Sequence, residues 1–82
     1  MVKIEVLGTK CAKCKRVEKN ARDAVKELGL NIDVIKIDDF EEIIRRGIMM
    51  TPGLVIDGEI VALGRVPSVD EIKSMLSKLG TN

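Results

Sequence analysis

The segment VKIEVLGTKCAKC, from Val2 to Cys14, places two cysteines directly behind a strand-like run. Its first six residues alternate along the chain and are rich in β-branched side chains, which predicts a strand from Val2 to Leu7. Gly8 and Thr9 then interrupt this pattern. Apolar residues at helical spacing predict a helix from Ala12 to Leu28. The cysteine pair therefore lies where the first strand leads into the first helix.

The middle of the chain predicts a second strand and a short helix. An isoleucine-rich run predicts a strand at residues 32–37, and its apolar content indicates burial on both faces. Acidic residues at 38–39 and 41–42 resemble two overlapping capping boxes, which predict a helix start. Gly47 then favours an early stop, so this helix is expected to span about two turns.

The last third of the chain predicts a hairpin and a closing helix. Asp57-Gly58 separates apolar runs at residues 54–56 and 60–63, which is typical of a tight turn between antiparallel strands. After Pro67, Ser68 and Glu71 form a capping box that predicts a helix ending near Gly80. The residues therefore predict an α/β domain of order βαβαββα, with a mixed four-stranded sheet and flanking helices.

Composition limits the possible functions. A chain of 82 residues has room for one domain, with 45% hydrophobic and 33% charged residues as in a soluble globular protein. No apolar run spans a bilayer, and no signal peptide is visible, so we expect a cytoplasmic protein without a membrane partner. Fourteen basic against thirteen acidic residues, with one Phe and no Trp or Tyr, argue against nucleic-acid binding. The absence of His excludes imidazole-based catalysis.

The position of Cys11-Ala-Lys-Cys14 favours redox chemistry. Unpaired N–H groups and the helix dipole at a helix N-terminus stabilise a thiolate, and Lys10 and Lys13 add positive charge nearby. Thiols in such places have a pKa of roughly 3.5 to 7.5 instead of about 8.5. We therefore expect Cys11 to attack a substrate disulfide and Cys14, one turn further and less exposed, to resolve the mixed disulfide. This exchange needs no cofactor.

Other interpretations of the cysteines remain open at this point. Two small buried cysteines without function are disfavoured by their matched spacing and their lysine neighbours. A purely structural disulfide is disfavoured because so short a loop restrains little of the unfolded chain. Metal binding is the main competitor, since two thiolates suffice for Cu(I), although zinc would need further ligands from a second copy.

With these features, the chain resembles the thioredoxin superfamily, and within it the small thioredoxin-like or glutaredoxin-like redox-active disulfide proteins of prokaryotes. The resemblance covers nearly the whole chain and rests on the strand before Cys11-Ala-Lys-Cys14, the Thr51-Pro52-Gly53 step, the Asp57-Gly58 hairpin and the closing helix. It implies a cis bond before Pro52, a substrate chain bound by the backbone of Thr51, a disulfide-containing protein substrate and a thioredoxin-reductase-like or other electron donor. We expect the protein to act as a monomer.

The resemblance has limits. Ala12-Lys13 lies between the cysteines, where thioredoxins have Gly-Pro and glutaredoxins usually have Pro-Tyr, and no glutathione site is assignable. Many thioredoxins keep a buried carboxylate beneath the cysteine pair, and Glu5 is the candidate here for tuning the thiol pKa. The alternatives for Glu5 are a pair with Lys3 or Lys36, or simple solvation.

One competing function comes from another fold. Copper or heavy-metal chaperones of the ferredoxin-like kind also carry Cys-x-x-Cys after a first strand, but they place two strands after the first helix and end in a strand. The expected element order argues against that fold. Met49 and Met50 could serve as soft-metal ligands, but such residues more often fill a core or form an adaptable apolar rim for a partner. Thiol-disulfide exchange therefore ranks first.

Overall fold

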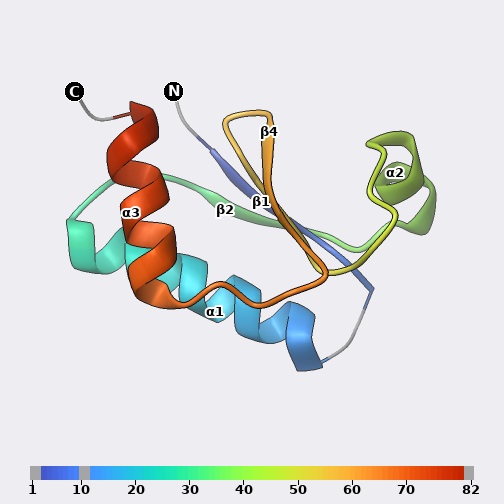
Figure 1. The fold of residues 1–82 in the computed structure, drawn as a ribbon, viewed down its shortest axis with the longest axis horizontal. Coiled ribbons are helices and arrows are strands. Elements are labelled where there is room, and N and C mark those ends of the chain that lie inside the picture. Colours follow the sequence, from blue (N-terminus) through green and yellow to red (C-terminus); the bar gives the residue numbers. More distant parts are fainter. Residues whose placement is uncertain (1–2, 10–11, 81–82) are drawn as a thin grey trace.

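β1 (Ile4–Leu7) and α1 (Ala12–Leu28) begin the chain where the hydrophobic pattern predicts them. The computed structural model of the protein describes residues 3–9 and 12–80. The elements that follow are β2 (Val34–Ile37), α2 (Phe40–Arg45), β3 (Gly53–Ile56), β4 (Glu59–Leu63) and α3 (Val69–Gly80), as Figure 1 shows. This is the predicted order βαβαββα.

The four strands form one mixed sheet in the order β2-β1-β3-β4. β1 runs parallel to β2 and antiparallel to β3, with Leu7 opposite Gly53. β3 and β4 are antiparallel, and the Asp57-Gly58 turn between them has positive φ at both residues, as a tight hairpin turn requires. The predicted strand directions are therefore confirmed. Because β1 and β3 are antiparallel neighbours, the last residue of β1 and the first of β3 meet at one end of the sheet.

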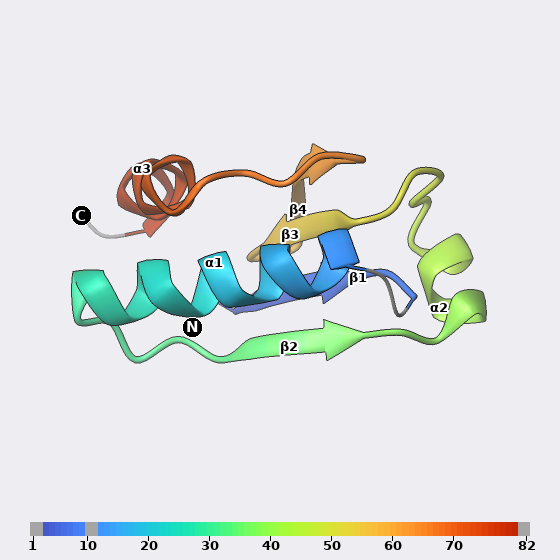
Figure 2. The same ribbon diagram turned by 90° about the horizontal axis from the view of Figure 1, so that it is seen from below.

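Two hydrophobic cores lie on opposite faces of this sheet. On one face α1 packs against α3 and covers the sheet, and the larger core lies between these layers. Its buried members are Ile4, Val6, Val17, Ala21, Ala24, Val25, Leu54, Ile56, Ala62, Ile72 and Leu76. The smaller core, on the face of α2, consists of Leu7, Ile43, Ile48 and Val55. Figures 1 and 2 show α2 and α3 at opposite ends of the molecule.

The local helix signals are largely confirmed. Gly29, with φ of +66°, follows the last residue of α1. Ser68 and Glu71 form both hydrogen bonds of the capping box, each at 3.1 Å, and α3 follows. At α2 the side chain of Asp39 accepts a hydrogen bond from the backbone N–H of Glu41. The expected capping boxes at this helix are wrong, because the carboxylate of Glu42 binds Arg45 and Arg46 instead of reaching back to the backbone of Asp39. No helix within residues 3–9 and 12–80 is both long and apolar enough to cross a membrane.

The expected burial of β2 on both faces is wrong. β2 is an outer strand of the sheet, and Ile35 keeps 40% of its surface exposed. The cause is the length of α2, because a helix of six residues at one end of the sheet leaves the rest of that strand uncovered (Figure 1). An apolar strand is a reliable sign of burial only where both faces have a covering layer.

Candidate active site

The cysteine motif and the Thr51-Pro52 step meet at the end of the sheet where β1 finishes and β3 begins. Leu7 pairs with Gly53, so the residues just after Leu7 and just before Gly53 are neighbours. Cys11 and Lys10 lie outside the described residues. Cys14 is described, and it lies fully buried in the first turns of α1. The shielded position expected for Cys14 is therefore confirmed.

Gly8 provides the space that Cys14 occupies. An ideal Cβ atom on Gly8 would overlap the sulfur of Cys14 and would lie 3.6 Å from the Cβ atom of Thr51. The backbone N–H of Gly8 donates to the carbonyl oxygen of Ile37 at 2.9 Å, which fixes the position of the chain at Gly8. The absence of a side chain on Gly8 thus allows Cys14 to approach both the end of β1 and Thr51. Sequence reasoning treated Gly8 only as the end of a strand.

The peptide bond between Thr51 and Pro52 is cis, as the family resemblance implies. Pro52 is fully buried and its carbonyl oxygen accepts a hydrogen bond from the backbone N–H of Gly64 at 2.8 Å, whereas Thr51 is exposed. The alternative of a proline that opens an edge strand is wrong, because β3 lies between β1 and β4. Thr51 is thus exposed beside the buried sulfur of Cys14 on a firmly held segment.

The start of α1 is rich in positive charge. Lys13, Lys15 and Arg16 are exposed, and none of them forms an ion pair with another described residue. The first turn of α1 contains no acidic residue, although acidic side chains are the favoured ones at a helix N-terminus. This charge arrangement agrees with the predicted role of Lys13 near the motif, while its effect on Cys11 stays a prediction.

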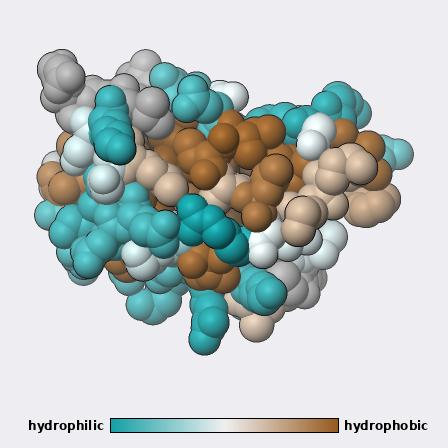
Figure 3. Space-filling view, viewed as in Figure 1, coloured by the Kyte–Doolittle hydropathy of each residue, from teal (hydrophilic) through white to brown (hydrophobic). Residues whose placement is uncertain are grey.

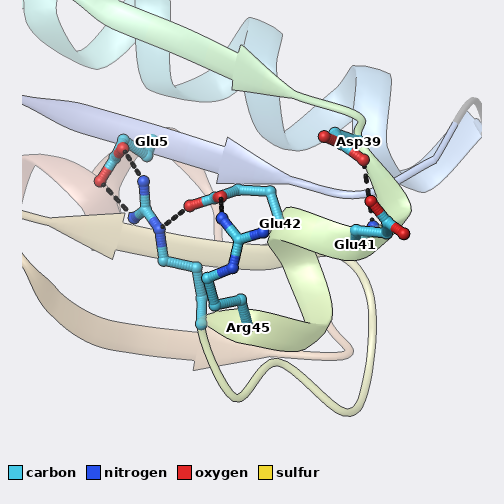
Figure 4. Close-up of polar contacts among 6 residues, drawn as sticks. Glu5, Asp39, Glu41, Glu42 and Arg45 are labelled. Atoms are coloured by element: carbon cyan, nitrogen blue, oxygen red, sulfur yellow. Dashed lines mark hydrogen bonds and ion pairs between the residues drawn. The ribbon is translucent and has the colours of Figure 1, made fainter.

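Glu5 has a different partner from those that the sequence suggested. Its buried carboxylate accepts hydrogen bonds from Nη1 and Nη2 of Arg46 at 3.0 and 2.9 Å, instead of pairing with Lys3 or Lys36 (Figure 4). Solvation is excluded as well, since Glu5 is only 3% exposed. The hydrogen bonds from Arg46 hold the pKa of Glu5 below its ordinary value, against the opposing effect of burial.

The position of Glu5 does not support a proton relay for the cysteines. Ile4 and Val6 belong to the core under α1, so the alternation of β1 directs Glu5, together with Leu7, toward the face of α2. Cys14 belongs to α1, on the opposite face of the sheet. A relay also needs a carboxyl group whose pKa is near neutral, whereas the pKa of Glu5 is lowered.

An apolar groove opens beside Thr51. Its volume is about 420 Å³, and it is lined by Thr9, Phe40, Ile43, Ile44, Ile48, Met49 and Thr51. Phe40, Ile44 and Met49 are more than half exposed. Figure 3 shows hydrophobic surface over β4 and α2. The expectation of an apolar methionine rim agrees with this position of Met49.

The chain is similar to known thioredoxins over nearly its whole length. The family model of the thioredoxin domain matches residues 2–77. A thioredoxin of Methanothermobacter thermautotrophicus is 49% identical over 77 residues, which cover 94% of this chain and 100% of that protein. A thioredoxin of Methanocaldococcus jannaschii is 42% identical over 76 residues, with coverage of 93% and 87%.

Solved structures agree on the fold. The structure of thioredoxin-2 of the malaria parasite superposes with a TM-score of 0.73 at 16% identity and covers 95% of this chain and 82% of that one. The solution structure of oxidised thioredoxin from Plasmodium falciparum gives a TM-score of 0.61 at 17% identity, with coverage of 94% and 79%. The expected fold, with its mixed sheet and flanking helices, is therefore confirmed.

Proposed function

Because this chain belongs to the thioredoxin family and is a thiol-disulfide oxidoreductase, we propose that Cys11 is its nucleophile and Cys14 its resolving cysteine. The observation that carries these roles is the burial of the Cys14 sulfur between Gly8 and the neighbourhood of Thr51. A sulfur without solvent access is poorly placed to attack an incoming disulfide and well placed to attack one formed on its neighbour.

The proposed reaction consists of two successive thiol-disulfide exchange steps. The thiolate of Cys11 attacks one sulfur of a substrate disulfide, forms a mixed disulfide and releases the other substrate sulfur as a thiolate. The thiolate of Cys14 then attacks the sulfur of Cys11, which releases the second substrate thiolate and leaves a Cys11-Cys14 disulfide. Two electrons pass to the substrate, whose thiolates take up two protons. A reductase returns two electrons to the protein.

The helix start supplies the electrostatic part of this proposal. Lys10 and Lys13 flank Cys11 in sequence, and the first turn of α1 carries exposed cations and no carboxylate. These charges and the helix dipole lower the pKa of the Cys11 thiol, so the thiolate is present at neutral pH. We leave Glu5 out of this tuning, because the alternation of β1 directs its side chain to the face of α2, where it binds Arg46.

The Thr51-Pro52 step provides the substrate-binding part. The cis bond and the buried Pro52 hold Thr51 exposed next to Cys14, so that the backbone of Thr51 is available to an extended substrate chain. The groove beside Thr51 is lined by apolar side chains and two threonines, which fits an apolar side chain close to the substrate cysteine. A protein disulfide is therefore the substrate that the site fits best.

The physiological setting belongs to the same proposal. The family in general works with disulfide substrates and a reductase, and we assign to this chain a protein substrate and a thioredoxin-reductase-like or other electron donor. We infer one domain that acts as a cytoplasmic monomer. The metal-chaperone alternative finds no support in the comparisons, and α1 is followed by one strand and the short α2 where a ferredoxin-like fold would have two strands.

A redox titration with cysteine trapping tests the assigned roles. The purified protein is equilibrated in dithiol buffers, and its alkylated cysteines are counted by mass spectrometry. A reversible two-electron Cys11-Cys14 couple between about −180 and −280 mV supports the proposal. In parallel, Cys14→Ser should accumulate a mixed disulfide with insulin, whereas Cys11→Ser should not. Trapping by Cys11→Ser alone would reverse the two roles.

A further inference from the structure

Residues of α2 form one wall of the apolar groove beside Thr51. α2 is too short to be stable as an isolated helix. It spans only six residues, fewer than an isolated helix needs to be stable in water. Its position therefore depends on contacts with the rest of the protein. Ile43 and Ile48 are buried in the small core with Leu7 and Val55. These apolar contacts hold α2 on the sheet, but they are not directional and do not fix its exact position.

The ion pair of Glu5 and Arg46 fixes the position of α2 relative to β1. Glu5 lies on β1, an interior strand of the sheet, while Arg46 is the residue that caps the C-terminus of α2. The two Nη atoms of Arg46 bind both carboxylate oxygens of Glu5, and its Nε atom donates to Glu42 within α2 at 2.7 Å. One guanidinium group thus joins an interior strand to the helix, between the side chains of Glu5 and Glu42 that are labelled in Figure 4.

The chemistry of this contact makes it sensitive to position. A planar guanidinium bound through two parallel hydrogen bonds accepts little displacement, unlike an apolar contact. The carboxylate of Glu5 is buried, so the loss of Arg46 would leave a charge with no partner inside the protein. Both properties restrict the end of α2 to one location relative to β1.

We propose that the Glu5-Arg46 pair is a positioning device, which holds α2 so that Phe40 and Ile44 form the groove wall at the correct distance from Thr51. The pair thereby controls recognition of protein disulfides and leaves the thiol chemistry itself unchanged. This inference rests on the proposed function, in which the groove receives a side chain of the substrate protein.

The test compares one protein substrate with one small disulfide. Arg46→Lys keeps the charge but loses the two-pronged contact. We expect its KM for insulin disulfides to rise about tenfold, the effect of losing one good contact. Its kcat for insulin, its rate with 5,5′-dithiobis(2-nitrobenzoate) and the pH profile of Cys11 alkylation should stay within about twofold of the unaltered protein.

Two further variants separate positioning from stability. The double variant Glu5→Leu with Arg46→Met replaces the pair by apolar groups, a change that often preserves or raises stability. It should melt at or above the temperature of the unaltered protein and still show the raised KM. Ile72→Val, which removes one methylene group from the core under α3, should lower the melting temperature without changing the KM for insulin.

Each outcome has a defined meaning. A normal KM in the stable double variant would overturn the inference, because the pair would then contribute only stability. Equal losses with insulin and with the small disulfide would also overturn it, because the pair would then act on the thiols. Failure of the unaltered protein to reduce insulin, with a normal Cys11-Cys14 couple, would instead overturn the proposed protein substrate and this inference with it.

Discussion

The sulfur of Cys14 occupies the volume in which a side chain on residue 8 would lie, and Thr51 borders the same volume. The end of β1, the first turns of α1 and the segment before β3 are thereby packed against one another at a single point. A change at Gly8 should consequently reach the resolving cysteine, although residue 8 has no reactive group of its own.

Gly8→Ala tests this contact. The added methyl group overlaps the Cys14 sulfur, so the sulfur or the backbone has to move, and overpacking of this kind costs about 1 to 3 kcal/mol. We expect a lower free energy of unfolding in urea and slower resolution of the mixed disulfide with insulin. Ala24→Val is also an overpacking change, but it lies in the larger core between the sheet and α1 and α3. It should destabilise the protein while the mixed disulfide is resolved at the normal rate. Equal resolution rates in both variants would contradict the contact.

Ile44→Asp tests the groove. Ile44 lines the groove and is 56% exposed, so a charge there should leave the fold intact and repel an apolar substrate side chain. The KM for insulin disulfides should rise about tenfold, which corresponds to about 1.4 kcal/mol. Ile60→Asp on β4 is the matched control, because Ile60 is 43% exposed and lies outside the groove lining. A similar rise in both variants would show that general surface hydrophobicity matters instead.

The stability of the protein in acid tests the Glu5 ion pair. The pKa of Glu5 lies below its ordinary value of 4.5 in the folded protein, so the unfolded chain binds more protons between the two values. The stabilisation by ionised Glu5 is therefore complete above 4.5 and is lost as the pH falls through the folded-state pKa. Glu5→Gln should have a lower free energy of unfolding near neutral pH and a smaller decrease in acid.

Urea unfolding from about pH 6 to about pH 3 measures this difference. Glu71 also has a lowered pKa, chiefly because the backbone N–H of Ser68 donates to it, and its contribution has the same sign. Glu71 is present in both proteins, so the difference between the two curves isolates Glu5. Parallel curves over the whole range would refute the assigned direction of the pKa shift.

Ser68→Ala tests the capping box of α3. The substitution removes the hydroxyl that accepts from the N–H of Glu71, and loss of such a cap costs about 1 kcal/mol. The free energy of unfolding should fall by that amount, while the rate of disulfide exchange stays unchanged because α3 lies far from the motif (Figure 1). Ser74→Ala, at an exposed position within α3, should change stability little and serves as the control.

The sequence predicted those features that depend on neighbours along the chain. The Asp57-Gly58 turn and the Ser68-Glu71 box each involve residues at most three positions apart, and both are confirmed. The cis bond before Pro52 followed from the family resemblance, since the general frequency of cis proline would have argued against it.

The features that sequence reasoning missed are contacts between distant residues. Arg46 lies 41 positions from Glu5, and the hydrophobic periodicity along the sequence gives no indication that the two residues pair. The close approach of Gly8 to Cys14 depends on the crossing of β1 and α1, for which a glycine between the strand and the cysteine motif was the only hint. The exposure of β2 likewise reflects how little of the sheet α2 covers.

The hairpin turn lies at the end of the sheet remote from the cysteine motif. Ile56, just before the turn, pairs with Ile4, whereas Gly53 pairs with Leu7 beside the motif. A dye, a linker or a second protein module joined at Asp57-Gly58 would therefore project away from the reacting sulfurs. The molecule can be immobilised through this turn on a bead or an electrode with the motif end of the sheet directed toward the solution.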